Sequence, residues 1–178
     1  MKIVISGMHG SGKDTIADLL AKKLKIKRYS VGAFRRKMAE ERGITLAELN
    51  KIGEKEQFTD KEADDWQTKI GKNEDNFIID GRISFHFIPD SIKIFLKVSP
   101  EEGARRIMNA NREGEKMENI KQAIEMWNER MISDTARYKK YYNLNPFEEK
   151  YYDFVLDTTN LEIKEVFSKV MNFLKTKI

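Results

Sequence analysis

Short apolar runs alternate with longer stretches of helical periodicity along this chain. The runs are rich in β-branched and aromatic residues and predict five strands, near residues 3–5, 27–30, 77–80, 92–98 and 154–157. Apolar positions at helical spacing predict helices near residues 13–25, 99–109, 119–142 and 161–175. Because strands and helices alternate, we expect an α/β fold in which a five-stranded parallel sheet is covered on both faces, giving three layers.

The region between the second and third predicted strands departs from this pattern. Three short, highly charged helices without a strong apolar stripe are expected there. Thr45-x-x-Glu48 and Thr59-x-x-Glu62 each fit a capping box that would open one of them. We interpret residues 32–72 as a helical insert over the sheet edge, and the polar segment 109–118 as a short lid.

The composition narrows the class of protein. The chain has 178 residues, the usual size of one domain, so residues 1–178 are expected to fold as a single unit. It contains no cysteine, which excludes disulfides and thiolate metal sites and fits a reducing cytoplasm. No apolar run approaches the ~20 residues that cross a bilayer, and the N-terminus has the pattern of a core strand. We therefore predict a cytoplasmic protein without a membrane partner.

The most informative segment follows the first predicted strand and enters the first helix. It reads GMHGSGKDT, in which Gly7-x4-Gly12-Lys13 has the spacing of a phosphate-binding P-loop. Glycines let successive backbone N–H groups face one point, toward which the positive end of the helix dipole also points. Asp14 stands where the general motif has Ser or Thr. The residues expected to bind ATP are Gly7, Met8, His9, Gly10, Ser11, Gly12, Lys13, Asp14 and Thr15.

The net charge of +4 suits a phosphorylated small molecule, but a basic balance also suits nucleic acid. The charges are interspersed, and the sequence has no aromatic-basic platform, which argues against nucleic acid. Small-molecule nucleotides are the expected partners of a monomer or weak dimer.

Ligands of parallel α/β sheets bind beyond the carboxyl ends of the strands. Asp80 ends an apolar strand, where an acid of a P-loop enzyme orders Mg2+ through water. The alternative is an ordinary loop aspartate, but Arg82 two residues later favours a site.

The helix predicted near residues 119–142 places three charged residues beside an apolar stripe. At ~100° per residue, Arg130, Asp134 and Arg137 fall together at the border between core and cleft. Two guanidiniums can chelate phosphate oxygens, and an aspartate between them can orient one. Surface ion pairing is the alternative, and spacing alone leaves both open. The stripe consists of Ile120, Ile124, Trp127, Met131, Thr135 and Tyr138.

Other charged residues give weaker signals. Arginines that converge on a migrating phosphoryl group stabilise its charge. Three arginines flank the predicted lid, Arg105, Arg106 and Arg112, and we expect one or two of them to have this role. Of Arg35 and Arg36, one should point inward, and nothing local decides which. His9 and His86 are isolated and do not form a metal site.

These segments resemble those of nucleoside monophosphate kinases, most closely the short cytidylate kinases that include archaeal-type enzymes. GMHGSGKDT resembles their ATP loop, SVGAFRR their S-x-G-x-x-x-R segment, and IIDGR their DGR motif. Arg106-Ile107 resembles the R-I pair at the start of their lid. The spacing of Arg130, Asp134 and Arg137 matches their lid-side charges. The acidic stretch Asp60–Gln67 is similar to a helix of the archaeal-type enzymes, and DTTNLEIKEV to the closing segment.

The resemblance implies a P-loop NTPase fold with a nucleotide-binding insert, and transfer of a phosphoryl group from ATP to a nucleoside monophosphate, CMP or dCMP. It implies Mg2+ held by Thr15 and, through water, by Asp80. The implied acceptor-binding residues are Ser30, Gly32, Arg36, Asp80, Arg82, Arg130, Asp134 and Arg137. The implied catalytic residues are Lys13, Arg106, Arg130 and Arg137.

The sequence departs from these kinases where they read the nucleotide. Ile83 follows DGR where bacterial cytidylate kinases typically have an acid, and Val31 stands where they have Ser. Archaeal-type enzymes tend to have Glu at the position of Asp80 and often lack the lysine that Lys13 supplies. Two alternatives stay open. A metabolite kinase of the shikimate or gluconate sort would need a base, either Asp80 or Asp134. An ATP-gated nucleic-acid-binding module would make no soluble diphosphate.

Overall fold

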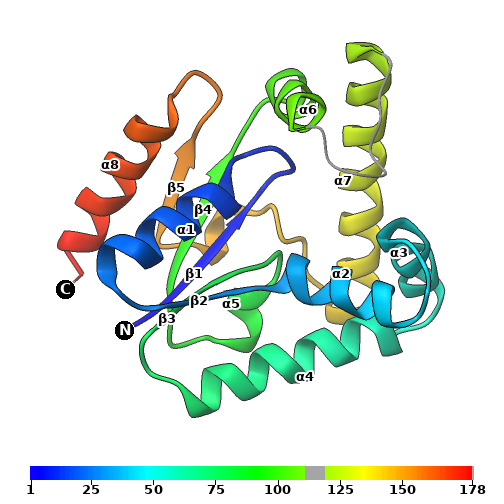
Figure 1. Ribbon diagram of the computed structural model, residues 1–178, viewed down its shortest axis with the longest axis horizontal. Coiled ribbons are helices and arrows are strands. Elements are labelled where there is room, and N and C mark those ends of the chain that lie inside the picture. The colour runs from blue at the N-terminus through cyan, green and yellow to red at the C-terminus, as the bar shows by residue number, and fades with distance from the viewer. Residues whose placement is uncertain (111–118, 178) are drawn as a thin grey trace.

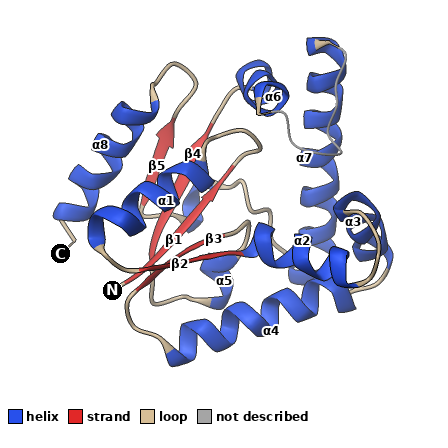
Figure 2. Cartoon of the chain, viewed as in Figure 1, coloured by secondary structure: helices blue, strands red, loops and turns tan. Residues whose placement is uncertain are grey.

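The computed structural model describes residues 1–110 and 119–177, and its centre is a single parallel sheet. The strand order is β2-β3-β1-β4-β5, and every neighbouring pair is parallel. All five predicted strands form, so the α/β prediction is confirmed (Figure 2). The strands are β1 (Lys2–Gly7), β2 (Lys27–Ser30), β3 (Phe77–Asp80), β4 (Ile92–Lys97) and β5 (Phe154–Asp157).

Helices cover both faces of this sheet, which confirms the three-layer arrangement (Figure 1). On one face, α1 (Lys13–Leu24) and α8 (Ile163–Lys175) pack on alternate residues of β1, Ile3 and Ile5. On the other face, Val4 packs with residues of α4 (Phe58–Asn73), α5 (Ser84–Phe87) and α7 (Ile120–Tyr142). The alternation follows from the two-residue period of a strand, which sends neighbouring side chains to opposite faces.

Three helices lie between β2 and β3, as predicted: α2 (Val31–Glu41), α3 (Leu46–Lys55) and α4. We call them the insert helices. They share a small core of their own, built on Met38, Ala39 and Leu49. Figure 1 shows them at the β2 side of the sheet, beside the C-terminal part of α7.

One of the two predicted capping boxes is confirmed and the other is wrong. The Thr45 hydroxyl accepts from the Glu48 N–H, and the Glu48 carboxylate accepts from the Thr45 N–H at 2.7 Å. Helix α4 instead begins at Phe58, because the N–H groups of Asp60 and Lys61 donate to the Gln57 carbonyl and place Thr59 inside the first turn. A buried ion pair between Arg35 and Asp60 holds this first turn against α2.

Helix α6 (Pro100–Asn109) begins as predicted, with Ser99 as its N-cap and proline at its first position. It packs against α7 through Ala104, Ile107, Ala123 and Trp127. The predicted stripe of α7 is wrong at its first position, because Ile120 is 40% exposed. The sequence pattern also missed α5 and the 3-10 helix η1 (Glu149–Tyr151). The predicted lid at 109–118 lies outside the described residues, apart from Asn109 and the following Ala110.

Candidate active site

The glycine loop between β1 and α1 is tightly packed against α6. Gly10 and Gly12 have φ angles of 77° and 82°, which L side chains rarely adopt. A Cβ on Gly10 would lie 2.3 Å from the carbonyl oxygen of Gly103 in α6. The loop then enters α1 at Lys13, so its backbone N–H groups and the N-terminus of α1 form an anion-binding corner.

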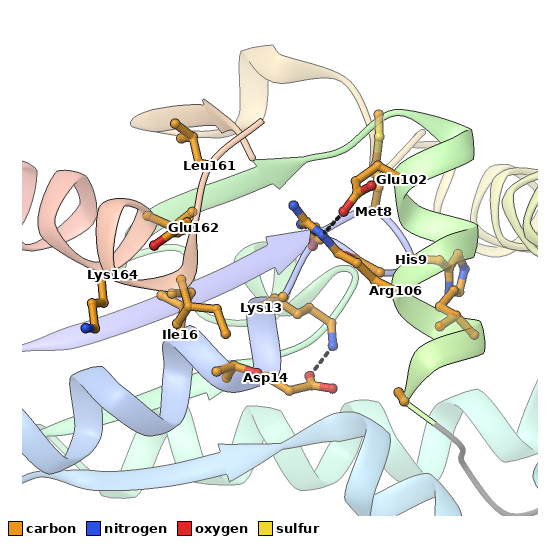
Figure 3. A pocket seen from close by; sticks show the side chains of 18 of the residues that line it. Met8, His9, Lys13, Asp14, Ile16, Glu102, Arg106, Leu161, Glu162 and Lys164 are labelled. Atoms are coloured by element: carbon orange, nitrogen blue, oxygen red, sulfur yellow. Dashed lines mark hydrogen bonds and ion pairs between the residues drawn. The ribbon is translucent and has the colours of Figure 1, made fainter. Parts of the chain in front are cut away.

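A cavity of about 690 Å³ opens above this loop (Figure 3). Its size is that of a small-molecule site. Loop residues from Met8 to Thr15 line it, whereas Gly7 is not part of the lining and its carbonyl accepts from the Arg82 guanidinium. Its remaining walls come from α6, the start of α8, and the arginines Arg82, Arg106 and Arg130. The structure therefore brings the predicted ATP-binding residues together with three of the predicted arginines.

Lys13 lies between two carboxylates. Its ammonium pairs with Asp14 (Figure 3) and is 3.7 Å from Oδ2 of Asp80. Asp80 is fully buried, and burial raises the pKa of its carboxyl although the Lys13 and Arg28 charges oppose this. Arg28 Nε donates to Asp80 Oδ1 at 2.9 Å, and Ser30 Oγ donates to Oδ2 at 2.9 Å. Sequence reasoning missed Arg28, although the parallel register that places Ser30 beside Asp80 brings the charged strand β2 to this corner.

The acidic residues of this corner suit a cation that arrives with phosphates. Among residues 1–110 and 119–177, no group of three or more His, Cys, Asp or Glu could hold a metal alone. The corner offers the carboxylates of Asp14 and Asp80 and the hydroxyl of Thr15, which lines the cavity. Mg2+ typically takes one or two carboxylates and completes its shell with water and phosphate oxygens, so these residues fit it.

Asp134 of α7 joins the glycine loop to the segment after β3. Its Oδ2 accepts from Arg82 Nε at 2.9 Å and lies 3.0 Å from His9 Nε2. Burial alone would raise the pKa of Asp134, but the hydrogen bond from His9 and the charges of Arg82 and Arg137 hold it well below its usual range. Asp134 and Arg137 are both buried, so the alternative that Asp134 only forms ion pairs on the surface is wrong.

His9 is fixed as a neutral ring between Asp134 and Arg82. Burial and the Arg82 charge together lower the pKa of His9 to about 4, although Asp134 opposes them. Nε2 therefore donates to Asp134, and Nδ1 accepts from Arg82 Nη2 at 2.7 Å. The His9 carbonyl accepts from the indole N–H of Trp127 at 2.7 Å. The sequence placed His9 in the loop but did not indicate these partners.

Arg137 extends the same chain of charges toward the insert helices. Its Nη2 donates to Asp134 Oδ1 at 3.0 Å, and its Nε is 3.7 Å from Asp60 Oδ2. Arg35 completes the chain, with Nη1 donating to Asp60 Oδ1 at 2.8 Å. Thus Arg35 is the inward-pointing member of the predicted pair, and Arg36 is exposed.

The remaining predicted residues divide between the cavity and the surface. Arg36 lies over the start of α2, near Gly32 and Ser30. Its Nη1 is 3.6 Å from the position that a Cβ on Gly32 would occupy, and Ser30 Oγ is 3.8 Å from the same position. Arg106 lines the cavity and donates to the Thr158 carbonyl at 2.7 Å, a contact the sequence did not reveal. Arg105 pairs with Glu102 at an exposed position, His86 lies outside the cavity lining, and Arg112 is outside the described residues.

Comparison with known proteins decides the family. The model of the cytidylate kinase-like family matches residues 2–160. The chain belongs to the cytidylate kinase-like family. A cytidylate kinase from Sulfurisphaera tokodaii is 36% identical over 184 residues, 99% of this chain and 98% of that one. A cytidylate kinase from Methanobrevibacter smithii is 30% identical over 175 residues, 98% of this chain and 99% of that one.

Solved structures agree on the fold. A shikimate kinase from Bacteroides thetaiotaomicron has a TM-score of 0.70 at 15% identity, with 98% of each chain covered. The resemblance to nucleoside monophosphate kinases is confirmed, and this member of the cytidylate kinase-like family is a phosphotransferase of that type. No described helix has the length and apolar character needed to cross a membrane.

Proposed function

We propose that this kinase transfers the γ-phosphoryl group of ATP to CMP or dCMP. The observation that carries the proposal is the position of Arg82. Its guanidinium lines the cavity above the glycine loop and also a second, smaller cavity toward the insert helices. An arginine shared by two cavities can contact a phosphoryl group as it passes from a donor in one to an acceptor in the other.

On this proposal, the donor phosphates bind the N–H groups of the loop from Gly7 to Thr15. Lys13 follows the transferred group, and Arg106 and Arg130 act from the other walls of the cavity. Mg2+ is held by Thr15 and, through water, by Asp80, and when bound it neutralises phosphate charge. The residues proposed to hold and orient the acceptor are Ser30, Gly32, Arg36, Asp80, Arg82, Arg130, Asp134 and Arg137.

A phosphate acceptor explains why the site needs no general base. The second pKa of a phosphate monoester is about 6, so its attacking oxygen is already anionic near neutral pH. A hydroxyl acceptor would require one of two aspartates as its base, and both are engaged: Asp80 by Arg28 and Ser30, and Asp134 by Arg82 and Arg137. The choice of a cytidine nucleotide is supported by the family and by the names of its relatives.

A panel of acceptors tests the proposal. Purified protein is incubated with ATP and Mg2+ and with CMP, dCMP, UMP or AMP, and the diphosphate products are separated by ion-exchange chromatography. CDP or dCDP should form fastest, and Lys13→Ala protein should form neither at a comparable rate. If none of the four acceptors yields a diphosphate, the proposed function is wrong. Phosphorylation of shikimate or gluconate instead would identify a metabolite kinase.

A further inference from the structure

The smaller cavity lies between the insert helices, α7 and the segment that follows β3. Its polar lining residues are Arg35, Asp60, Asp64, Gln67, Arg82 and Tyr138, and Val31 and Ile83 form an apolar part of the wall. It measures about 10 Å³, which is room for a single water. Two carboxylates and two guanidiniums in so small a space provide hydrogen-bond acceptors and donors side by side.

Asp64 differs from the other acid of this cavity in its partners. Asp60 is paired with Arg35, whereas no described basic side chain lies within ion-pair distance of Asp64. Asp64 accepts instead from neutral groups, the Tyr142 hydroxyl and the Gln67 amide, the latter at 3.1 Å. When Asp64 is ionised, no basic side chain of the described residues therefore pairs with its charge at the cavity wall, and the carboxylate can accept from a further donor.

Gln67 is held in one orientation beside this carboxylate. It is 1% exposed, and its Oε1 accepts from Ser84 Oγ at 2.7 Å. This contact turns the amide nitrogen toward Asp64. A side chain fixed at both ends presents its remaining N–H in a defined direction, as a specific recognition site requires.

We propose that Asp64, positioned by Gln67, reads the amino group at position 4 of the acceptor's cytosine ring. This inference rests on the proposed function and identifies the residue that sets its base preference. Cytosine presents a donor at position 4 and acceptors at N3 and O2, which match a carboxylate and the guanidiniums of the same cavity. Uracil presents a carbonyl oxygen at position 4, which an ionised carboxylate repels.

Binding of the base requires this cavity to widen. Polar contacts hold the insert helices to α7: Ser133 and Lys140 contact Glu54, the Tyr141 hydroxyl donates to the Gly53 carbonyl at 2.9 Å, and Tyr142 and Arg137 contact Asp64 and Asp60. The base enters between α4 and the segment after β3, and α4 must shift relative to α7 against these contacts for the cavity to widen. A pyrimidine needs less widening than a purine, so CMP is favoured over AMP although both carry an amino group.

The test compares two neighbouring acids of α4. Asp64→Asn removes the charge at the cavity wall, whereas Asp65→Asn makes the same change at an exposed residue paired with Lys61. kcat/KM is measured for CMP and for UMP at pH 8. Burial raises the pKa of Asp64 to about 6, aided by Asp60 and opposed by Tyr142, Gln67 and Arg35, so at pH 8 the wild-type carboxyl is ionised.

Asp64→Asn should lower the ratio of kcat/KM for CMP to that for UMP by at least about tenfold, the worth of one hydrogen bond to a charged group. Asp65→Asn should leave the ratio unchanged. Both substrates are measured on one preparation, so a misfolded fraction lowers both rates equally and does not alter the ratio. Calorimetric titration of each variant with CMP and with UMP gives the same comparison without turnover.

The two failures are distinguishable. If wild-type protein phosphorylates CMP and Asp64→Asn keeps the wild-type ratio in both measurements, the assignment of Asp64 is wrong and the kinase proposal stands. If wild-type protein phosphorylates none of the monophosphates, the kinase proposal itself is wrong. An equal fall in the ratio for both variants would also overturn the assignment, because it would indicate an effect of net charge.

Discussion

The two cavities that share Arg82 are built in opposite ways. The larger one is built around a single contiguous segment, Met8 to Ile16, which supplies nearly half of its lining residues, and is wide in this structure. The smaller one draws on α2, α4, α7 and the segment after β3, and is nearly closed. Its lining residues come from positions as distant in sequence as Val31 and Tyr138. One wall of the larger cavity is therefore set by local backbone geometry, whereas every wall of the smaller one depends on how distant segments pack.

Removing Asp134 should have the largest effect on stability, because it breaks the link between the two cavities. Asp134→Ala leaves the buried Arg137 and the half-buried Arg82 without their shared carboxylate. Loss of one partner from a buried ion pair costs about 3–5 kcal/mol. The free energy of unfolding, measured with urea, should fall by this amount. Glu129→Ala, at an exposed position of the same helix, is the control, and equal stabilities for the two variants would show that the network contributes nothing.

Lys13→Ala tests the local cavity and should separate catalysis from stability. The ammonium is the mobile charge nearest the loop, and removal of one such electrostatic contact lowers kcat about 10²–10³-fold. Unfolding free energy should change little, since Arg28 and Ser30 still hold Asp80. Coupled-assay kcat and urea unfolding measure both quantities, with Lys22→Ala on the exposed face of α1 as control. A stability loss as large as that of Asp134→Ala would remove the distinction between the cavities.

The same contrast explains what could be predicted from the sequence. The glycine loop was predicted residue by residue, because its spacing encodes its backbone geometry. The inward position of Arg35 was not, because its partner Asp60 lies 25 residues away. One signal was available: Arg35 shares the helix face of Met38 and Ala39, which are both buried. The roles of Arg28, Thr158 and Trp127 depend on contacts between distant segments, which no local pattern records.

His9 belongs both to the glycine loop and to the hydrogen-bonded network of Asp134 and Arg82, so its titration tests how strongly the loop depends on that network. The pKa of His9 is about 4 in the folded protein and 6.5 in the unfolded chain. The unfolded chain therefore binds the proton more tightly. Stability is therefore full above pH 6.5 and is lost as the pH falls toward 4, by roughly 3 kcal/mol in all. His9→Gln keeps a donor for Asp134 but does not titrate. Urea unfolding from pH 8 to pH 4 should show a steeper loss for wild type, and parallel curves would contradict the assignment of a neutral ring.

Two threonines of the insert helices provide the smallest and most local test. Thr45 caps α3 with its hydroxyl, so Thr45→Ala should cost about 1 kcal/mol of unfolding free energy. Thr59 matches the same sequence motif, but its hydroxyl is buried and caps nothing within the described residues. Thr59→Val keeps the shape, removes that unpaired hydroxyl and should not destabilise the protein. Thermal unfolding of both variants decides the matter. If Thr59→Val loses as much as Thr45→Ala, the Thr59 hydroxyl stabilises α4 after all, although the helix begins with hydrogen bonds to the Gln57 carbonyl.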